Sequence, residues 1–117
     1  MDDWVKSYFA VVDSMQMDAL LERHTEDATM AFNNSPVARG KDQIRAAIGG
    51  FWSAIDGLKH EFTNRYEDGD TVILEADVTY LRKDGAEAVV KTVSILHRSD
   101  ELVDHLAFYN DPSPIFA

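Results

Sequence analysis

The chain has 117 residues, enough for one domain with one core, and 45% of them are hydrophobic, which favours a folded protein over a disordered one. Eleven basic residues against twenty-one acidic ones give a net charge of −10, which argues against nucleic-acid binding because phosphate contacts need basic patches. The absence of cysteine excludes disulfides, thiolate catalysis and thiolate metal sites.

The first half of the chain predicts three helices and a strand. Apolar residues recur at helical spacing in WVKSYFAVVDSM, and Asp2 or Asp3 can cap this first helix. The stretch MQMDALLERHTEDA indicates a short second helix that ends near His24. ATMAFN predicts a short strand, closed by the turn-rich loop NNSPVARG, and a third helix is expected from Lys41 to about Ile55.

The second half, from GLKHEF onward, predicts a meander of four long strands. Its turns are marked by Asp68-Gly69, Asp84-Gly85 and Ser99-Asp100. The last strand, ELVDHLAFY, is apolar on both faces, so we expect helices on one side of it and a partner subunit of a homodimer on the other. Helices followed by an antiparallel sheet predict an α+β fold, with a ligand cavity between the helices and the concave face of the sheet.

Other features are predicted to be missing. No apolar run approaches the roughly 20 residues that a membrane helix needs, and the N-terminus lacks the pattern of a signal peptide, so we expect a cytoplasmic protein with no membrane partner. No set of His, Asp and Glu residues has metal-ligand spacing, and no glycine-rich phosphate loop occurs. We therefore expect neither a metal nor a cofactor.

Several segments together resemble the SnoaL-like branch of the nuclear transport factor two-like superfamily, which also holds ketosteroid isomerase, limonene epoxide hydrolase and scytalone dehydratase. They are WVKSYFAVVDSMQMDALLERHTEDATMAF, VARGKDQIRAAIGGFW, GLKHEF, EDGDTVILEADVTYLRKDG and FYNDPSP, in the family order. The resemblance implies a single SnoaL-like domain over residues 1–117. Its fold would be a cone-shaped, curved antiparallel sheet wrapped around N-terminal helices, the cystatin-like α+β barrel. This fold carries many chemistries, so it does not assign a reaction by itself.

The resemblance allows a comparison with the catalytic groups of the ketosteroid isomerases. Tyr8 matches their tyrosine, which donates a hydrogen bond to the developing enolate. Phe32 occupies the position of their aspartate base, and Val93 falls near their second donor, a protonated aspartate. The sequence therefore predicts that the protein either performs its proton chemistry from the last strands or performs none.

Three residues are candidates for catalysis. Tyr8 lies on the buried face of the first helix, either as a pocket donor or as a structural tyrosine with a satisfied hydroxyl. His105 shares strand parity with Ala107 and Tyr109, a set that the isomerase comparison places on the cavity side, where a neutral histidine could act as general acid or base. His60, where SnoaL-like relatives often carry histidine, could reach the cavity mouth or form a hydrogen bond across the sheet.

Lys91 interrupts the apolar strand AVVKTVSIL, where it could form a Schiff base inside the cavity or extend from the outer face of the sheet. The predicted pocket wall consists of Trp4, Val12, Met30, Phe32, Phe51, Trp52, Ile55, Lys91, Val93, Ala107 and Tyr109.

Two functions follow from these residues. The first is an enzyme of proton-transfer type, similar to an isomerase, cyclase or dehydratase, acting on a small apolar or polycyclic substrate with Tyr8 as donor and His105 or His60 as acid and base. The second is a non-catalytic ligand-binding or dimerisation domain, whose dry pocket lacks the family's carboxylate base. Catalysis needs a titratable group within reach of the ligand, whereas binding needs none.

Overall fold

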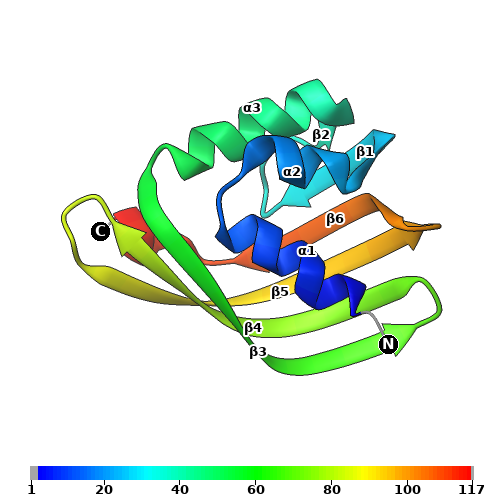
Figure 1. Cartoon of the computed structure of the whole chain (residues 1–117). Coiled ribbons are helices and arrows are strands. Elements are labelled where there is room, and N and C mark those ends of the chain that lie inside the picture. The colour runs from blue at the N-terminus through cyan, green and yellow to red at the C-terminus, as the bar shows by residue number, and fades with distance from the viewer. Residues whose placement is uncertain (1–2, 117) are drawn as a thin grey trace.

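A computed structural model describes residues 3–116 of the chain. Figure 1 shows one curved sheet with the helices α1, α2 and α3 on its hollow side, which confirms the predicted α+β fold. The elements in chain order are α1 (Trp4–Asp13), α2 (Met17–Glu22), β1 (His24–Phe32), β2 (Ala38–Arg39), α3 (Gly40–Trp52), β3 (Ile55–Asp68), β4 (Thr71–Arg82), β5 (Glu87–Ser99), β6 (Leu102–Asn110) and α4 (Ser113–Phe116).

The helices begin and end close to their predicted positions. Asp3 caps α1, because its carboxylate accepts hydrogen bonds from the backbone N–H groups of Val5 and Lys6; Asp2 lies outside the described residues. Two helices end slightly earlier than predicted, α2 at Glu22 and α3 at Trp52. His24 begins strand β1 instead of ending the second helix, and Ile55 begins strand β3 instead of ending the third.

The sheet has six strands in the order β2-β1-β6-β5-β4-β3. The meander β3 to β6 is antiparallel throughout and turns where the sequence predicts, at Gly69, Gly85 and Asp100, each of which has a positive φ. β1 joins this meander by pairing in parallel with β6. The sheet curves without closing, and the helices lie over its concave face (Figure 1).

The register of the meander decides which side chains face the hollow. Along β4 the residues from Val72 to Tyr80 are alternately buried, as predicted. On β5 the inward residues include Thr92, Ser94 and Leu96. These three pair with Asn110, Phe108 and Leu106 on β6, respectively, so the even-numbered residues at this end of β6 face the hollow.

This register corrects the predicted positions of five residues. His105, Ala107 and Tyr109 have the opposite parity on β6, and Lys91 and Val93 have the opposite parity on β5, so all five lie on the outer face of the sheet. Lys91 and Val93 are outward because the buried positions of β5 from Ala88 to Leu96 are the even-numbered ones. For the three β6 residues, the physical reason is that β6 is apolar on both faces, so its own pattern does not identify the inner one. Pairing with β5 identifies it.

Within residues 3–116, no helix is both long enough and apolar enough to cross a membrane.

Candidate functional site

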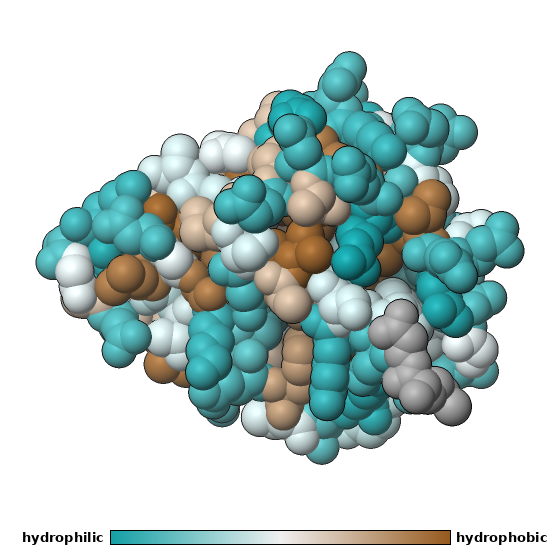
Figure 2. Space-filling view, viewed as in Figure 1, coloured by the Kyte–Doolittle hydropathy of each residue, from teal (hydrophilic) through white to brown (hydrophobic). Residues whose placement is uncertain are grey.

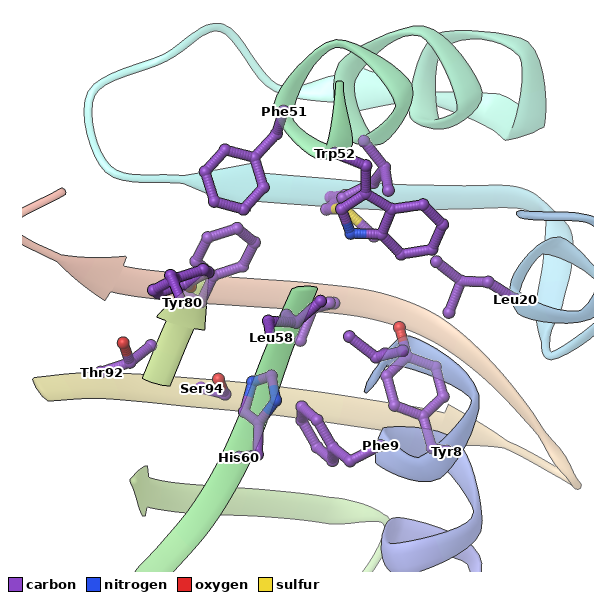
Figure 3. A pocket seen from close by; sticks show the side chains of 15 residues that line it. Tyr8, Phe9, Leu20, Phe51, Trp52, Leu58, His60, Tyr80, Thr92 and Ser94 are labelled. Carbon is purple, nitrogen blue, oxygen red and sulfur yellow. The ribbon is translucent and has the colours of Figure 1, made fainter. Parts of the chain in front are cut away.

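A small cavity of about 50 Å³ lies between α1, α3 and the concave face of the sheet. Figure 2 shows apolar side chains at the surface in the middle of this view, with hydrophilic side chains around them. Figure 3 shows how side chains from the helices and the strands converge on the cavity. Its walls carry six aromatic side chains: Tyr8, Phe9, Phe51, Trp52, Tyr80 and Phe108.

His60 reaches this cavity from β3 and is held by a carboxylate at the end of α1. Its Nδ1 lies 2.6 Å from Oδ1 of Asp13, and its backbone N–H donates to Oδ2 of the same carboxylate at 2.9 Å. The side chains are only 9% and 24% exposed. Because a carboxylate accepts hydrogen bonds, Nδ1 carries the proton in this pair, and in a neutral imidazole of this tautomer the lone pair is on Nε2.

Sequence reasoning identified His60 as a candidate but missed Asp13. One signal was present: Asp13 follows Phe9 by four residues, so it lies on the side of α1 that faces the cavity. An acidic side chain on the packed side of an amphipathic helix needs a partner, and β3 supplies it through the ring and the backbone of His60.

Tyr8 lines the cavity, but its hydroxyl is already engaged. His24, 1% exposed, has its Nδ1 2.8 Å from the carbonyl of Leu20 and its Nε2 3.0 Å from the hydroxyl of Tyr8. Since a carbonyl only accepts, Nδ1 donates to Leu20, and Nε2 must accept the proton of Tyr8. Burial raises the pKa of Tyr8, so its hydroxyl stays protonated. The proton of the Tyr8 hydroxyl is therefore donated to His24 in a buried structural hydrogen bond, and the hydroxyl has no second proton to donate to a ligand.

The buried His24 makes the stability of the fold sensitive to acid. Burial, with a smaller contribution from the charge of Lys41, lowers the pKa of His24 below its ordinary value. Above a pH of about 6.5 the ring is neutral in both the folded and the unfolded chain. As the pH falls further, the unfolded chain takes up the proton first, so the free energy of unfolding should decrease.

Urea unfolding between pH 8 and pH 5 measures this effect. The decrease below a pH of about 6.5 should be shallower in His24→Leu than in His97→Gln, which removes a half-exposed histidine from the outer face. Equal pH dependence in the two variants would contradict the assignment of the effect to His24.

Two further hydroxyls line the same cavity and have free hydrogen-bonding capacity. Tyr80 and Ser94 are 3% and 5% exposed, and neither hydroxyl has a hydrogen-bond partner among residues 3–116. Burial, together with the charge of Asp13, raises the pKa of Tyr80 to about 12, so the phenol is protonated at neutral pH. The cavity therefore offers one imidazole lone pair and two hydroxyl donors. Sequence reasoning missed Ser94 because it assigned Val93 to the inner face.

The remaining predicted residues divide between the cavity wall and other places. Val12, Met30, Phe51 and Trp52 line the cavity. Phe32 lies beside it, stacked on Phe108 in the wall of a second cavity.

Two predicted wall residues belong to other parts of the structure. Trp4 packs under the guanidinium of Arg98, with Cζ 4.8 Å from the ring centroid. Ile55 is buried in the core and lies outside both cavity walls.

The outer-face residues make contacts that do not reach the cavity. Nδ1 of His105 lies 2.7 Å from the hydroxyl of Thr29 on β1. The side chain of Lys91 is 91% exposed, with its Nζ 3.5 Å from a carboxylate oxygen of Asp77, which rules out the internal Schiff-base geometry. The proposed acid–base role of His105 in the cavity is corrected for the same reason, since its strand parity points it outward.

No group of three or more His, Asp or Glu side chains among the residues that the structure describes is arranged to hold a metal ion.

Comparisons with known proteins agree on one fold. The sequence model of the SnoaL-like domain matches residues 5–105. A hypothetical protein from Catenulispora acidiphila with a ketosteroid isomerase-like fold, solved in complex with trimethylamine, is similar with a TM-score of 0.85 at 20% identity, over 98% of this chain and 90% of that one. A protein from a Jannaschia species, described as a candidate SnoaL-like polyketide cyclase, has a TM-score of 0.79 at 17% identity, over 97% and 88%.

A similarly described protein from Shewanella putrefaciens has a TM-score of 0.81 at 11% identity, over 97% of this chain and 90% of that one. At such identities the likeness establishes the fold alone. No curated protein matches the chain.

Proposed function

Since the chain belongs to the SnoaL-like domain family, we propose that it is an enzyme that moves a proton on a small, mainly apolar substrate. The observation that carries this proposal is the Asp13–His60 pair in the wall of an otherwise apolar cavity. A neutral imidazole oriented by a carboxylate is the usual arrangement of a general base. In this proposal a histidine on β3 takes the role that an aspartate base has in the ketosteroid isomerases, where this chain has Phe32.

The reaction would begin with Nε2 of His60 removing a proton from a carbon next to a carbonyl group. The electron pair of the broken C–H bond forms a carbon–carbon double bond, and the carbonyl oxygen becomes an enolate oxygen. The hydroxyls of Tyr80 and Ser94 can donate hydrogen bonds to that oxygen, and Asp13 stabilises the imidazolium. Return of the proton to another carbon completes an isomerisation, whereas its transfer to a β-hydroxyl group that leaves as water completes a dehydration.

The cavity volume favours a small reacting group. A space of about 50 Å³ holds only a few water molecules, and drug-sized ligands occupy about 300–1,000 Å³. A polycyclic substrate would therefore need the aromatic walls to move. A small ketone or enone, or the reacting end of a longer molecule, fits with less rearrangement.

Exchange of carbon-bound protons for solvent deuterium tests the reaction without knowledge of the natural product. Small ketones and β-hydroxy ketones are incubated with the protein in deuterium oxide, and loss of the α-proton signal is followed by proton NMR. The proposal expects exchange above the buffer rate for at least one of them. Exchange at the buffer rate across the whole panel would favour the alternative function.

That alternative is a non-catalytic ligand-binding domain, and the apolar character of the cavity wall favours it. The Catenulispora protein, which has a similar fold, was solved in complex with trimethylamine, a small amine, so a protein of this fold can bind a small molecule. The two functions predict different results for a variant of His60. A His60→Gln variant that keeps ligand affinity but loses exchange supports the enzyme, whereas a binding domain shows no exchange in either form.

The outer face of the sheet supports a homodimer. Between the charged side chains it exposes apolar side chains in two groups, Leu81 and Val89 toward one end of β4 and β5, and Tyr66, Ile73, Val93 and Tyr109 toward the other; we call the six residues the outer apolar patch. Exposed apolar side chains gathered on a sheet face are typical of a protein–protein interface.

Sedimentation should therefore show a dimer at micromolar concentration. Val89→Asp, which puts a charge on the most exposed residue of the patch, should shift the protein to monomer. Ala46→Asp, on the exposed side of α3, serves as the control and should remain dimeric. A wild-type protein that sediments only as monomer would contradict the homodimer.

A further inference from the structure

We propose that a second cavity, beside the first, is a binding site for a neutral aromatic ring that carries a hydrogen-bond acceptor. It lies between α3, the end of β1, the end of β6 and the segment that leads into α4, and we refer to it as the ring cavity. Phe32, Asn33, Phe108, Asn110 and Phe116 contribute to its wall. The inference rests on the proposed function only in naming the part of the substrate that does not react.

The volume of the ring cavity suits one aromatic ring. It measures about 180 Å³, against about 50 Å³ for the cavity at His60. An apolar cavity of about 150 Å³ engineered into another protein is large enough to bind benzene. A single ring therefore fits here, whereas the cavity at His60 is too small for one.

The wall of the ring cavity offers aromatic surfaces. The rings of Phe32 and Phe108 are stacked, with centroids 5.4 Å apart and planes inclined by 12°. Phe51 and Phe116 add two more rings from α3 and α4, and Phe116 is 60% exposed. Offset stacking and edge-to-face contacts favour an aromatic ligand over an aliphatic one of similar size.

Two amides give the ring cavity a polar side. Nδ2 of Asn33 donates to Oδ1 of Asn110, and the backbone N–H of Asn110 donates to Oδ1 of Asn33, each at 2.8 Å. Each side-chain oxygen therefore already accepts one hydrogen bond. Each Nδ2 carries two N–H groups, and the structure uses one on Asn33 and one on Asn110, the latter toward Thr92 at 3.4 Å. The remaining N–H groups are donors, so the ligand they suit carries an acceptor such as a carbonyl oxygen.

The backbone at Asn33 is held in a sparsely populated conformation. Its φ is +49°, in the left-handed region, and its backbone N–H donates to the carbonyl of Phe108. Asparagine tolerates this region better than most residues, and such conformations gather at ligand sites. The strained turn places the Asn33 amide against Asn110, which accounts for the polar side of the cavity.

The ring cavity is adjacent to the cavity at His60. Ile48, Phe51 and Phe108 line both. A hydrogen bond also links the walls of the two cavities: Asn110, which lines the ring cavity, donates to Thr92, which lines the cavity at His60. The partition consists of side chains, so a rotation of Phe51 or Phe108 would let one molecule occupy both. The substrate class is then an aromatic compound with an acceptor group on its ring, which the asparagine amides bind, and a separate carbonyl group whose acidic carbon lies near His60.

Binding of benzamide, which has no acidic carbon next to its carbonyl group, tests the site apart from catalysis. Nitrogen–proton NMR reports the side-chain amides of Asn33 and Asn110 directly. We expect benzamide to shift these signals at saturation and to bind more tightly than toluene, which lacks an acceptor, and than cyclohexanecarboxamide, which lacks an aromatic ring. Failure of benzamide to bind, or shifts confined to other residues, would overturn the proposal.

Filling the cavity provides a matched pair of variants. Ala47 lines the ring cavity, whereas its neighbour Ala46 is exposed on the same helix. Ala47→Leu should weaken benzamide binding by at least about tenfold, and Ala46→Leu should leave it unchanged, since only the first places extra methyl groups in the cavity. Equal affinity in the two variants would overturn the site.

Two further variants remove the remaining ambiguities. If Ala47→Leu fails to fold, Phe116→Ala replaces it. Truncation of this exposed ring should weaken benzamide binding by about threefold or more without affecting the core. Unchanged affinity of Phe116→Ala for benzamide would overturn the site. His60→Gln should bind benzamide like the wild type. Failure of the proposed reaction would thus appear as absent exchange with benzamide binding intact, and failure of the ring site as absent binding.

Discussion

His60→Gln should reduce α-proton exchange by at least about 100-fold, the usual contribution of a general base. Glutamine is close to histidine in size and can still donate to Asp13, so the cavity wall should keep its shape. It has no nitrogen lone pair that can take up a proton, so the step at Nε2 is lost. The rate of deuterium exchange of the best ketone in the panel measures the effect.

His105→Gln is the matched control. His105 lies on the outer face and contacts Thr29, so the same chemical change there should leave the exchange rate within about twofold of wild type. Asp13→Asn should lower the rate by about tenfold or more, because it removes the charge that stabilises the imidazolium. Comparable rates for His60→Gln and His105→Gln would show that His60 is not the base.

Tyr8→Phe should lower the free energy of unfolding by about 1–3 kcal/mol, the cost of leaving a buried acceptor without its donor. The acceptor is Nε2 of His24, which cannot reverse its role because Nδ1 donates to the carbonyl of Leu20. The change removes one oxygen and leaves the aromatic contact with Phe9 in place. Urea unfolding at pH 8 measures the loss.

Tyr80→Phe is the control for this effect, because Tyr80 is equally buried but has no hydroxyl partner among residues 3–116. The free energy of unfolding of Tyr80→Phe should differ from that of the wild type by less than about 1 kcal/mol. The two variants should act in the reverse order on exchange: Tyr80→Phe lowers the rate and Tyr8→Phe leaves it nearly unchanged. A Tyr8→Phe variant that is stable but inactive would restore Tyr8 to the donor role that the family resemblance implies.

The fold was largely predictable because its elements have regular patterns. The apolar spacing of α1 and the alternation along β4 each have a single interpretation. The turns at Gly69 and Gly85 have the residues that positive φ favours. The inner face of β6 was not predictable in this way, since both faces carry apolar side chains, Leu106 and Phe108 on one and Ala107 and Tyr109 on the other.

The site was predictable only in part because its pairs are made by tertiary contacts. Asp13 and His60 are 47 residues apart, and their contact depends on the packing of the last turn of α1 against β3. The partnership of Tyr8 and His24 required β1 to begin earlier than its apolar run suggested. Ser94 could have been found from Lys91: a lysine that extends outward places residues 92 and 94 inward.

Strand β3 lies at one end of the sheet, so one of its edges has no neighbouring strand in the described sheet. Residues 61–68 are exposed on both faces, and a free strand edge of this length is a template for fibre-like growth. Charged side chains at Glu61, Arg65, Glu67 and Asp68, and a bulge between Phe62 and Asn64, break that template. These features disfavour pairing of the β3 edge with a strand of another copy.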